Sequence, residues 1–272
     1  MTTMDRAYVV VSRIVAVLLA LFFLLPIVWM LVLSLTPEGQ DLFSGNVQFS
    51  FANYEKVLSQ APIFGWMGNS LIVSVITTTL VLLFSSLAAY AFSRISFPGS
   101  KWLFLLFLSG MMIPGEATLI PLYLFMRDLG LLGTRTSLIL PAIAGPMGIF
   151  IMKQFFDGLP KDLEEAARMD GAGFFKIWYR IFLPLSRPAL AALGIFTFIG
   201  SWNDYVWPLI SISDKAFMTI TLGLPMFQSS YVQQYALPMT ANALAAIPVL
   251  IVFLLFQKQI IKGIAFTGGK EG

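Results

Sequence analysis

Six long stretches without charged residues at their centres dominate this 272-residue chain. A helix of about 20 apolar residues crosses the roughly 30 Å hydrocarbon core of a bilayer. Inside lipid every backbone polar group needs an internal partner, so such stretches are expected to be helical. The sequence therefore predicts an all-α membrane protein with six transmembrane helices. The predicted spans are 14–36, 69–92, 102–125, 136–155, 188–209 and 239–256.

The first stretch is too long for the apolar core of a signal peptide, so we expect it to be retained as a span. The segments between the spans are too short for a separate soluble domain. We therefore expect residues 1–272 to form a single transmembrane domain. Several prolines lie within or near the spans and are interpreted as ordinary kinks, which membrane helices tolerate. They are Pro26, Pro114, Pro141, Pro146 and Pro248.

Histidine and cysteine are both absent from the chain. Their absence excludes imidazole general bases, thiolate nucleophiles and the imidazole or thiolate ligands of most zinc sites. Charged residues make up only 11% of the sequence, less than half of the roughly 25% typical of a soluble domain. We expect no catalytic residue and no metal site in this chain.

The distribution of lysine and arginine indicates the orientation of the chain in the membrane. Cytoplasmic segments carry most of the basic residues near the ends of spans. With the N-terminus inside, 13 of the 17 basic residues fall on the cytoplasmic side. Both termini are therefore predicted to be cytoplasmic. The basic pI of about 9.1 follows from this asymmetry, so nucleic-acid binding is not expected.

The polar loop 157–186 stands out between the fourth and fifth predicted spans. Together with the flanking Lys153 and Arg187 it holds 11 of the 31 charged residues. Pro160 suits a first helical position, and Gly171 suits the left-handed residue that ends a helix. A second short helix is predicted from Phe174 to Phe182, ending before Pro184 because the residue before proline avoids the α region.

The first helix of this loop combines acidic residues with small ones. Leu163, Ala166 and Ala167 share one face, and the side chains beside Glu165 are small. A helix with nearly bare backbone suits insertion into a cleft on a partner protein. The alternative is a helix lying on lipid headgroups, which would favour basic residues on its polar face. The acidic residues favour protein docking.

A spaced motif in this loop resembles a known signature. Glu165-Ala-Ala, three residues, Gly171, nine residues, Ile181, one residue and Leu183-Pro184 match the EAA signature of ATP-binding-cassette (ABC) importer permeases. The resemblance implies a type I importer permease fold, in which this loop is the coupling helix that docks into a cleft of the ATPase subunit. The implied coupling residues are Glu165, Ala166, Ala167, Arg168, Asp170 and Gly171. Glu165 is the implied charge partner of a basic residue on the ATPase.

Further segments between residues 16 and 263 are similar to the carbohydrate-uptake, maltose-type branch of these permeases. They include Leu87 to Arg94, Met112 to Gly115 and Trp202 to Leu209. The chain lacks a long external insertion and so resembles the smaller of the two maltose-type permeases. Its tail, 264–272, differs from the tails of relatives, which puts a tail contact with the ATPase in doubt.

The resemblance implies a multi-pass permease of a bacterial-type inner membrane that imports a sugar or oligosaccharide by alternating access. The implied partners are a sister permease, two ATP-binding subunits and an extracytoplasmic solute-binding protein. The chain itself would bind no cofactor, with ATP and Mg²⁺ held by the ATPase. The external segment 211–237 is polar enough to meet the binding protein. Its polar residues include Gln228, Ser229, Ser230, Gln233 and Gln234.

Two alternatives bear on mechanism and substrate. An ion-coupled secondary transporter would carry titratable groups near the bilayer midplane, yet spans one, two and six contain no charge, and the only charge in span four is Lys153, close to its end. Asn203 and Asp204, beside Trp202, have the polar and aromatic character of a sugar site and are our candidate substrate-pathway residues. The alternative for these residues is an interfacial aromatic belt with a capping Asn-Asp pair.

Overall fold

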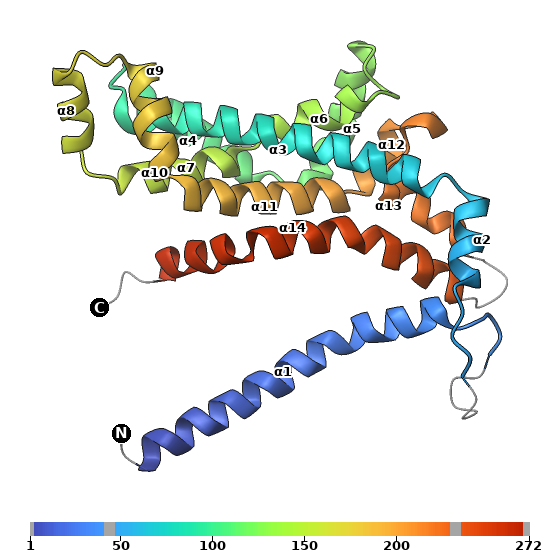
Figure 1. The fold of residues 1–272 in the computed structure, drawn as a ribbon. Coiled ribbons are helices and arrows are strands. Elements are labelled where there is room, and N and C mark those ends of the chain that lie inside the picture. Colours follow the sequence, from blue (N-terminus) through green and yellow to red (C-terminus); the bar gives the residue numbers. More distant parts are fainter. Residues whose placement is uncertain (1–2, 41–46, 229–234, 269–272) are drawn as a thin grey trace. The chain divides into compact units, whose positions relative to one another are not determined.

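The computed structural model describes residues 3–40, 47–228 and 235–268, with side chains for 8–40, 47–228 and 235–257. Every regular element in these ranges is helical, which confirms the predicted all-α class (Figure 1). The longer helices are α1 (Thr3–Leu35), α3 (Ile63–Arg94), α11 (Arg187–Asn203) and α14 (Ala236–Gly268). Shorter helices before the 157–186 loop are α2 (Ala52–Gln60), α4 (Ser100–Ser109), α5 (Gly115–Asp128), α6 (Arg135–Ile143) and α7 (Pro146–Asp157). Those that follow are α8 (Asp162–Met169), α9 (Phe174–Ile177), α10 (Leu183–Leu185), α12 (Val206–Ser211) and α13 (Ile220–Gly223).

Four short elements with other helical geometries complete the part of the chain that the structure describes. Three are 3₁₀ turns, at Gly110–Met112, Lys215–Phe217 and Leu224–Phe227, and the fourth is a π-helical segment at Trp178–Phe182. The external segment 211–237, where we expected contact with a binding protein, is described except for residues 229–234, and the end of the tail, 269–272, also lies outside the described residues.

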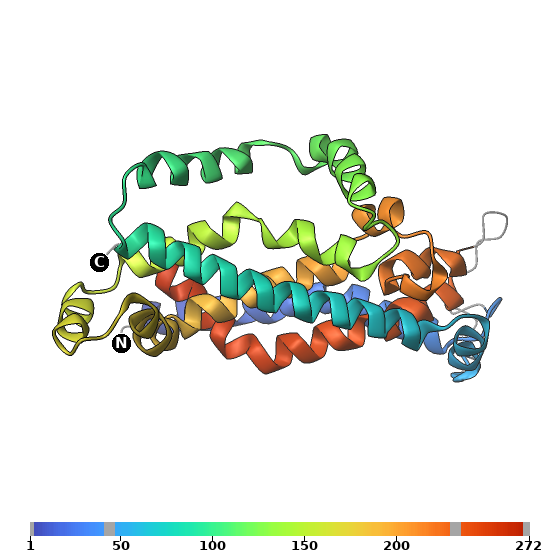
Figure 2. The same ribbon diagram turned by 90° about the horizontal axis from the view of Figure 1, so that it is seen from above.

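Among the described residues, three helices are individually long and apolar enough to cross a membrane. They are Tyr8–Leu35, Ile63–Arg94 and Ala236–Gln257, and the number rises to six if each of three bent helix pairs counts as one span. The bend between α4 and α5 is 104°, that between α6 and α7 is 41°, and that between α9–α10 and α11 is 79°. Figure 2 shows the sharp bend between α4 and α5. The exact span limits stay a prediction.

Prolines mark several of these breaks. Pro114 immediately precedes α5, and Pro146 occupies the first position of α7, where a missing N–H leaves no hydrogen bond unmade. Pro26, Pro141 and Pro248 instead lie inside α1, α6 and α14. That Pro26, Pro141 and Pro248 kink their helices stays a prediction, whereas Pro114 and Pro146 stand at helix boundaries.

The chain divides into two compact units. The first comprises Met1–Ile63 and Gly223–Ile247, and the second comprises Phe64–Leu222 and Pro248–Gly272. In the first unit the buried Asn53 side chain donates to the backbone oxygens of Ser34 at 3.0 Å and Thr36 at 2.8 Å. Thr240 donates to the same Ser34 oxygen at 3.2 Å. These bonds satisfy carbonyl groups at the end of α1 that have no partner within the helix.

In the second unit, α3 packs closely against α7 and α11 through small residues. Gly148 of α7 lies against Ser85 of α3, and Gly194 of α11 lies against Leu82. Glycine allows helix backbones to approach closely, which is how membrane helices gain packing contacts. The Ser85 hydroxyl is buried and has no hydrogen-bond partner among the described residues. This residue therefore contributes a small packing surface at that contact.

We predict that Gly148→Ala destabilises the protein. The added methyl group would overlap the Ser85 hydroxyl and lie 3.1 Å from Ser85 Cβ. Overpacking of this kind costs about 1–3 kcal/mol. In detergent, the midpoint of thermal unfolding should fall by roughly 2–4 °C for each kcal/mol. Ser85→Ala should restore part of the loss.

Gly200→Ala is the matched control, because Gly200 is also inside a helix, yet a Cβ there meets nothing within 4 Å among the described residues. Alanine should leave stability unchanged or raise it slightly, because it restricts the unfolded chain. Equal midpoints for Gly148→Ala and Gly200→Ala would contradict the close contact between α3 and α7.

Candidate functional site

The predicted first helix of the 157–186 loop is present as α8 (Asp162–Met169). It begins two residues later than predicted, with Lys161 at the N-cap position and Pro160 outside the helix. The Lys161 carbonyl accepts hydrogen bonds from the backbone N–H groups of Glu164 at 2.9 Å and Glu165 at 3.1 Å. Acidic residues then occupy the first turn, where the helix dipole favours negative charge.

Gly171 ends α8 as predicted. Its φ of +74° lies in the left-handed region. The Gly171 N–H donates to the Arg168 carbonyl and the Ala172 N–H donates to the Ala167 carbonyl, each at 2.9 Å. These two bonds form a Schellman motif, the standard termination of a helix by a left-handed glycine. The motif fixes the direction in which the chain leaves α8.

The predicted coupling residues share this short helix and its C-terminal turn. Glu165, Ala166 and Arg168 are exposed on α8, and Asp170 and Gly171 are exposed just after it. Ala167 differs, because it is half-buried and packs against the hydrophobic cluster described below. Five of the six predicted coupling residues are therefore exposed, and Ala167 attaches the helix to the rest of the unit.

Glu164 is a structural residue that the sequence analysis missed. It is buried, and its Oε1 accepts from Arg168 Nη2 at 2.7 Å. The Arg168 guanidinium also lies 4.5 Å from the centre of the Phe174 ring. A glutamate four residues before an arginine is the favoured orientation for a helical ion pair, and this spacing was the signal available in the sequence. The contact of Arg168 with the Phe174 ring joins α8 to the start of α9.

The second helix of the loop continues further than predicted. It starts at Phe174 but runs through a π-helical segment, Trp178–Phe182, and then through α10 to Leu185. Pro184 therefore lies inside helical structure, and the prediction that the helix ends before it is wrong. A π turn widens the backbone just ahead of the proline, which makes room for a ring that an α-helical ladder would exclude.

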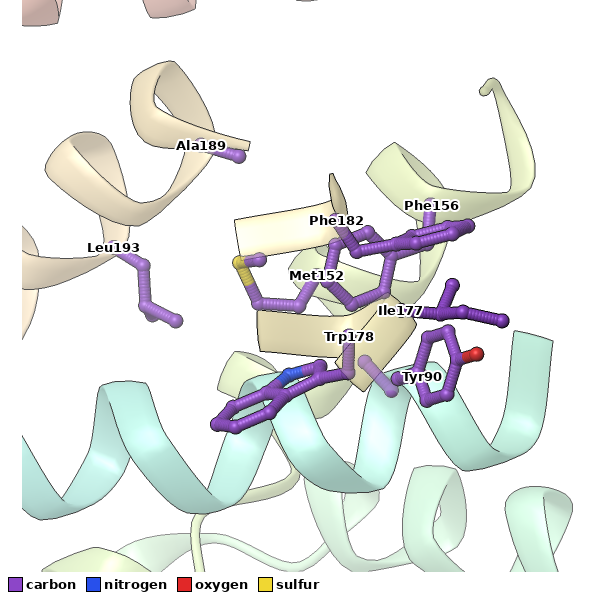
Figure 3. Packing of buried hydrophobic residues seen from close by; sticks show 9 residues of the cluster. Tyr90, Met152, Phe156, Ile177, Trp178, Phe182, Ala189 and Leu193 are labelled. Atoms are coloured by element: carbon purple, nitrogen blue, oxygen red, sulfur yellow. The ribbon is translucent and has the colours of Figure 1, made fainter. Parts of the chain in front are cut away.

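A buried aromatic cluster holds the two ends of the loop against α3 (Figure 3). Tyr90 of α3, Phe156 of α7 and Phe182 of the π segment meet edge to face. Their ring centres lie 5.0 Å apart for Tyr90–Phe182, 5.3 Å for Phe156–Phe182 and 6.5 Å for Tyr90–Phe156. Such pairs contribute about 0.5–1.5 kcal/mol each beyond the area they bury. Met152, Ile177 and Trp178 complete the packing.

Arg94, the last residue of α3, also reaches the loop. Its Nη2 donates to the Phe156 carbonyl and, at 2.7 Å, to the Leu159 carbonyl. Its guanidinium lies 5.0 Å from the centre of the Phe182 ring. In the sequence Arg94 is a basic residue at a span end and closes one of the segments that resemble the carbohydrate-uptake permeases, but nothing in the spacing indicates these contacts. It is a second residue that the sequence analysis missed.

The three candidate substrate-pathway residues are not brought together. Trp202 is only 2% exposed and stacks on Phe198 with ring centres 6.0 Å apart. Asn203 is exposed at the end of α11. Asp204 is half-buried, and its Oδ1 accepts from the Trp207 backbone N–H at 3.4 Å. The capping role suggested by the Asn-Asp sequence therefore belongs to Asp204.

Asp204 does line a pocket of about 330 Å³, together with Glu116 at the start of α5. Two carboxylates thus face a space whose other walls are mainly apolar, including Leu138, Val206 and Trp207. The Trp207 indole N–H donates to the Ser137 carbonyl at 2.8 Å, which fixes this wall. No group of three or more metal-binding side chains occurs among the described residues.

Comparison with known proteins identifies the class to which this fold and loop belong. The family described as "Binding-protein-dependent transport system inner membrane component" matches residues 81–266. The chain belongs to this family, so it is an inner-membrane permease subunit of an importer that works with a substrate-binding protein, and its ATPase is a separate subunit. The matched region includes α8 and the aromatic cluster.

Individual relatives extend the similarity over nearly the whole chain. The arabinooligosaccharides transport system permease protein AraQ of Bacillus subtilis is 38% identical over 262 residues, 94% of this chain and 93% of that protein. The trehalose/maltose transport system permease protein MalG of Thermococcus litoralis is 34% identical over 264 residues, 94% of this chain and 95% of that protein. These similarities confirm the resemblance to the carbohydrate-uptake branch.

A solved structure agrees with the fold. One chain of a bacterial ABC transporter involved in the import of the acidic polysaccharide alginate superimposes with a TM-score of 0.82 and 26% sequence identity. The superposition covers 95% of this chain and 98% of that chain. The predicted ABC importer permease fold is therefore confirmed.

We predict that Gly171→Ala weakens the end of α8. A left-handed conformation costs a residue with a Cβ roughly 1–2 kcal/mol. Amide hydrogen exchange across 162–172 should become faster in the variant, because local opening of the helix becomes easier. Gly171→Asn should exchange more slowly than Gly171→Ala, since asparagine tolerates this conformation better.

Gly173→Ala is the control for this substitution. Gly173 has a φ of −73°, and a Cβ there meets nothing within 4 Å among the described residues. Its exchange should match wild type. Faster exchange in Gly173→Ala, with none in Gly171→Ala, would contradict the Schellman termination.

Proposed function

We propose that this chain carries a sugar or oligosaccharide across the inner membrane as one half of a heterodimeric ABC importer. A sister permease forms the other half, a solute-binding protein delivers the sugar outside, and two ATP-binding subunits hold ATP and Mg²⁺ inside. AraQ and MalG are permeases of arabinooligosaccharide and trehalose/maltose transport systems, which supports a carbohydrate substrate.

The observation that carries this proposal is the construction of α8. Its exposed side carries Glu165 and Ala166 beside an exposed Schellman turn, whereas its other side is fixed by Ala167 and by the Glu164–Arg168 pair. A docking element that transmits force needs both an accessible contact surface and a rigid attachment. α8, a helix of eight residues, has the contact surface on one side and the attachment on the other.

The residues proposed to contact the ATPase are Glu165, Ala166, Ala167, Arg168, Asp170 and Gly171. Glu165 would pair with a basic residue of the ATPase. Ala166 and Gly171 would let the partner's surface approach the backbone closely. Arg168 and Ala167 would act mainly by holding α8 in place.

We propose that the importer alternates between an inward-facing and an outward-facing conformation, and that nucleotide binding shifts the equilibrium between them. The ATPase subunits bind nucleotide when closed on each other, and their closure moves the attached coupling loops of the two permeases together. Nucleotide then stabilises whichever membrane conformation matches the closed ATPase, which we propose to be the outward-facing one. Hydrolysis would return the complex to the inward-facing conformation.

The pocket beside α5 and α12 is the proposed substrate contact of this chain. Carboxylates accept hydrogen bonds from sugar hydroxyls, and the pocket of about 330 Å³ has two of them, on Asp204 and Glu116. Two negative charges would repel an acidic sugar, so we propose a neutral saccharide. Asn203 would contribute from the end of α11, whereas Trp202 would act through packing because its ring is buried.

We predict that Glu165→Lys abolishes coupling. Reversal of this charge would place two like charges together in the ATPase cleft. In the reconstituted importer, stimulation of ATP hydrolysis by sugar-loaded binding protein should fall at least about tenfold, as expected for the loss of a charged hydrogen bond worth more than 1.4 kcal/mol. The measurement is the stimulated rate relative to the unstimulated rate.

Glu55→Lys makes the same charge reversal at an exposed position on α2 and is the control. It should leave stimulation at the wild-type level. Wild-type stimulation in Glu165→Lys, with normal expression and solubility, would overturn the proposed role of Glu165.

We predict that Asp204→Asn slows sugar transport. The substitution keeps the size of the side chain and removes a charged hydrogen-bond acceptor, a loss of about 1.5–3 kcal/mol for each bond to sugar. Transport into proteoliposomes should slow by about tenfold or more. Asp128→Asn is the control, because Asp128 is exposed and pairs with its neighbour Arg127. Wild-type transport in both Asp204→Asn and Glu116→Gln would exclude the pocket as the sugar contact.

A further inference from the structure

One guanidinium group connects both ends of the coupling loop to the end of α3. Arg94 donates to carbonyl groups of Phe156 and Leu159, which precede α8, and its guanidinium covers the ring of Phe182, which follows α9. The carbonyls at the end of a helix carry partial negative charge and have no helical partners, so a cation at that position binds them well. Displacement of either end of the loop would break contacts with α3.

Neighbouring side chains reinforce this attachment. The Ser93 hydroxyl donates to Asp157 Oδ1 at 2.7 Å, and Lys153 Nζ pairs with Asp157 Oδ2 at 2.6 Å. Asp157 is the last residue of α7, directly before the loop. The final two residues of α3 therefore both hold the point at which the loop begins.

The first turns of α3, almost the whole helix away, are attached to a different loop. Asn69 Nδ2 donates to the backbone oxygens of Ala216 at 2.8 Å and Met218 at 2.9 Å, and the Ile220 N–H donates to the Ser70 hydroxyl at 2.8 Å. These three acceptor and donor groups belong to the 212–220 loop, which joins α12 to α13. Asn69 and Ser70 are 5% and 2% exposed, so these bonds are shielded from water.

Arg135 also contacts both Asn69 and the 212–220 loop at this end of α3. Its Nη2 donates to Asn69 Oδ1 at 2.7 Å, and its guanidinium lies 5.1 Å from the centre of the Phe217 ring. Every hydrogen-bonding group of the Asn69 amide is thus used: two donations to the loop and an acceptance from Arg135. Each end of α3 therefore holds one loop through hydrogen bonds: the 212–220 loop at Asn69 and Ser70, and the coupling loop at Arg94.

α3 is a continuous helix of 32 residues without proline, and the two attachments lie near its two ends. At 1.5 Å per residue it is roughly 48 Å long, enough to span the bilayer. Its middle is held by the close contacts with Gly148 and Gly194. A helix packed in this way is expected to move as one body, without bending between its ends.

We propose that α3 is a rigid strut that carries the motion of the coupling loop to the 212–220 loop, with Arg94 and Asn69 as the positioning residues at its two ends. The proposal rests on the proposed function, because it takes the ATPase to act on α8. It adds that closure of the ATPase displaces α8, α3 and the 212–220 loop together. The surface offered on the far side of the membrane would then change with the state of the ATPase.

The direct test is a distance measurement between the two loops. The chain has no cysteine, so Lys176→Cys and Lys215→Cys, both exposed, can carry a pair of spin labels. In the assembled importer with cysteine-free partners, pulsed electron paramagnetic resonance should give the same narrow distance distribution with and without ATP. A wild-type distance that changes when ATP binds would overturn the proposal.

Substitutions at the two ends test the positioning residues. Arg94→Gln and Asn69→Ala should each broaden the distance distribution in the ATP-bound state. Arg94→Gln should also lower the ratio of binding-protein-stimulated to unstimulated ATP hydrolysis about fivefold or more, within the usual range of coupling between sites. Arg94→Lys should recover part of this ratio, because lysine can donate to the carbonyls but lacks the planar fork and stacking surface of arginine.

Arg127→Gln is the matched control, since Arg127 is exposed and pairs with the adjacent Asp128. It should leave the distances and the ratio unchanged. Wild-type distances and ratio in Arg94→Gln would overturn the role of Arg94. If Glu165→Lys abolishes stimulation but the loop-to-loop distance changes with ATP, the strut fails while the proposed function stands. If Glu165→Lys remains coupled, the proposed action of the ATPase on α8 through Glu165 fails, whatever the distances show.

Discussion

The contact of Tyr90, Phe156 and Phe182 joins the coupling loop to the membrane helices, and the functional account depends on it. The three rings come from α3, α7 and the π segment, which are far apart in the sequence. This contact, the Arg94 contacts and the packing of Ala167 together attach the loop that carries α8 to α3 and α7. The burial of the rings and the Arg94 contacts with them attach the polar loop to the helices. We propose that displacement of α8 therefore displaces the helices as well.

This construction agrees with the distribution of charge in the chain. Eleven of the 31 charged residues lie in or beside the 157–186 loop, where Glu164 and Arg168 form an ion pair within α8 and Glu165 stays exposed. We propose that the chain moves in response to a reaction on another subunit. Membership of the importer permease family agrees with this division of labour.

Local features of the loop were predictable from the sequence because they depend on neighbours in the chain. Gly171 ends α8 through its own backbone freedom, and the exposure of Glu165 and Ala166 follows from the polarity of the segment. The path through Pro184 was not predictable, because tertiary packing of Trp178 and Phe182 stabilises a π turn that local preferences disfavour. The contacts of Arg94 could not be predicted for the same reason.

The candidate substrate residues illustrate the same limit. Trp202, Asn203 and Asp204 are adjacent in sequence, yet three consecutive residues at a helix end point in different directions. Trp202 packs on Phe198, whereas Asp204 caps the first turn of α12 and lines a pocket with Glu116. Sequence spacing identified a polar and aromatic segment, but only the fold brings Asp204 and Glu116, which are far apart in the sequence, to the lining of one pocket.

We propose that the ATPase acts on the surface of α8. This contact can be tested by hydrogen–deuterium exchange on the permease in lipid nanodiscs, with and without the ATPase subunits. Addition of the ATPase should slow exchange across 162–172, while exchange in α2 should be unchanged. Unchanged exchange at 162–172, with new protection elsewhere on the cytoplasmic side, would contradict it.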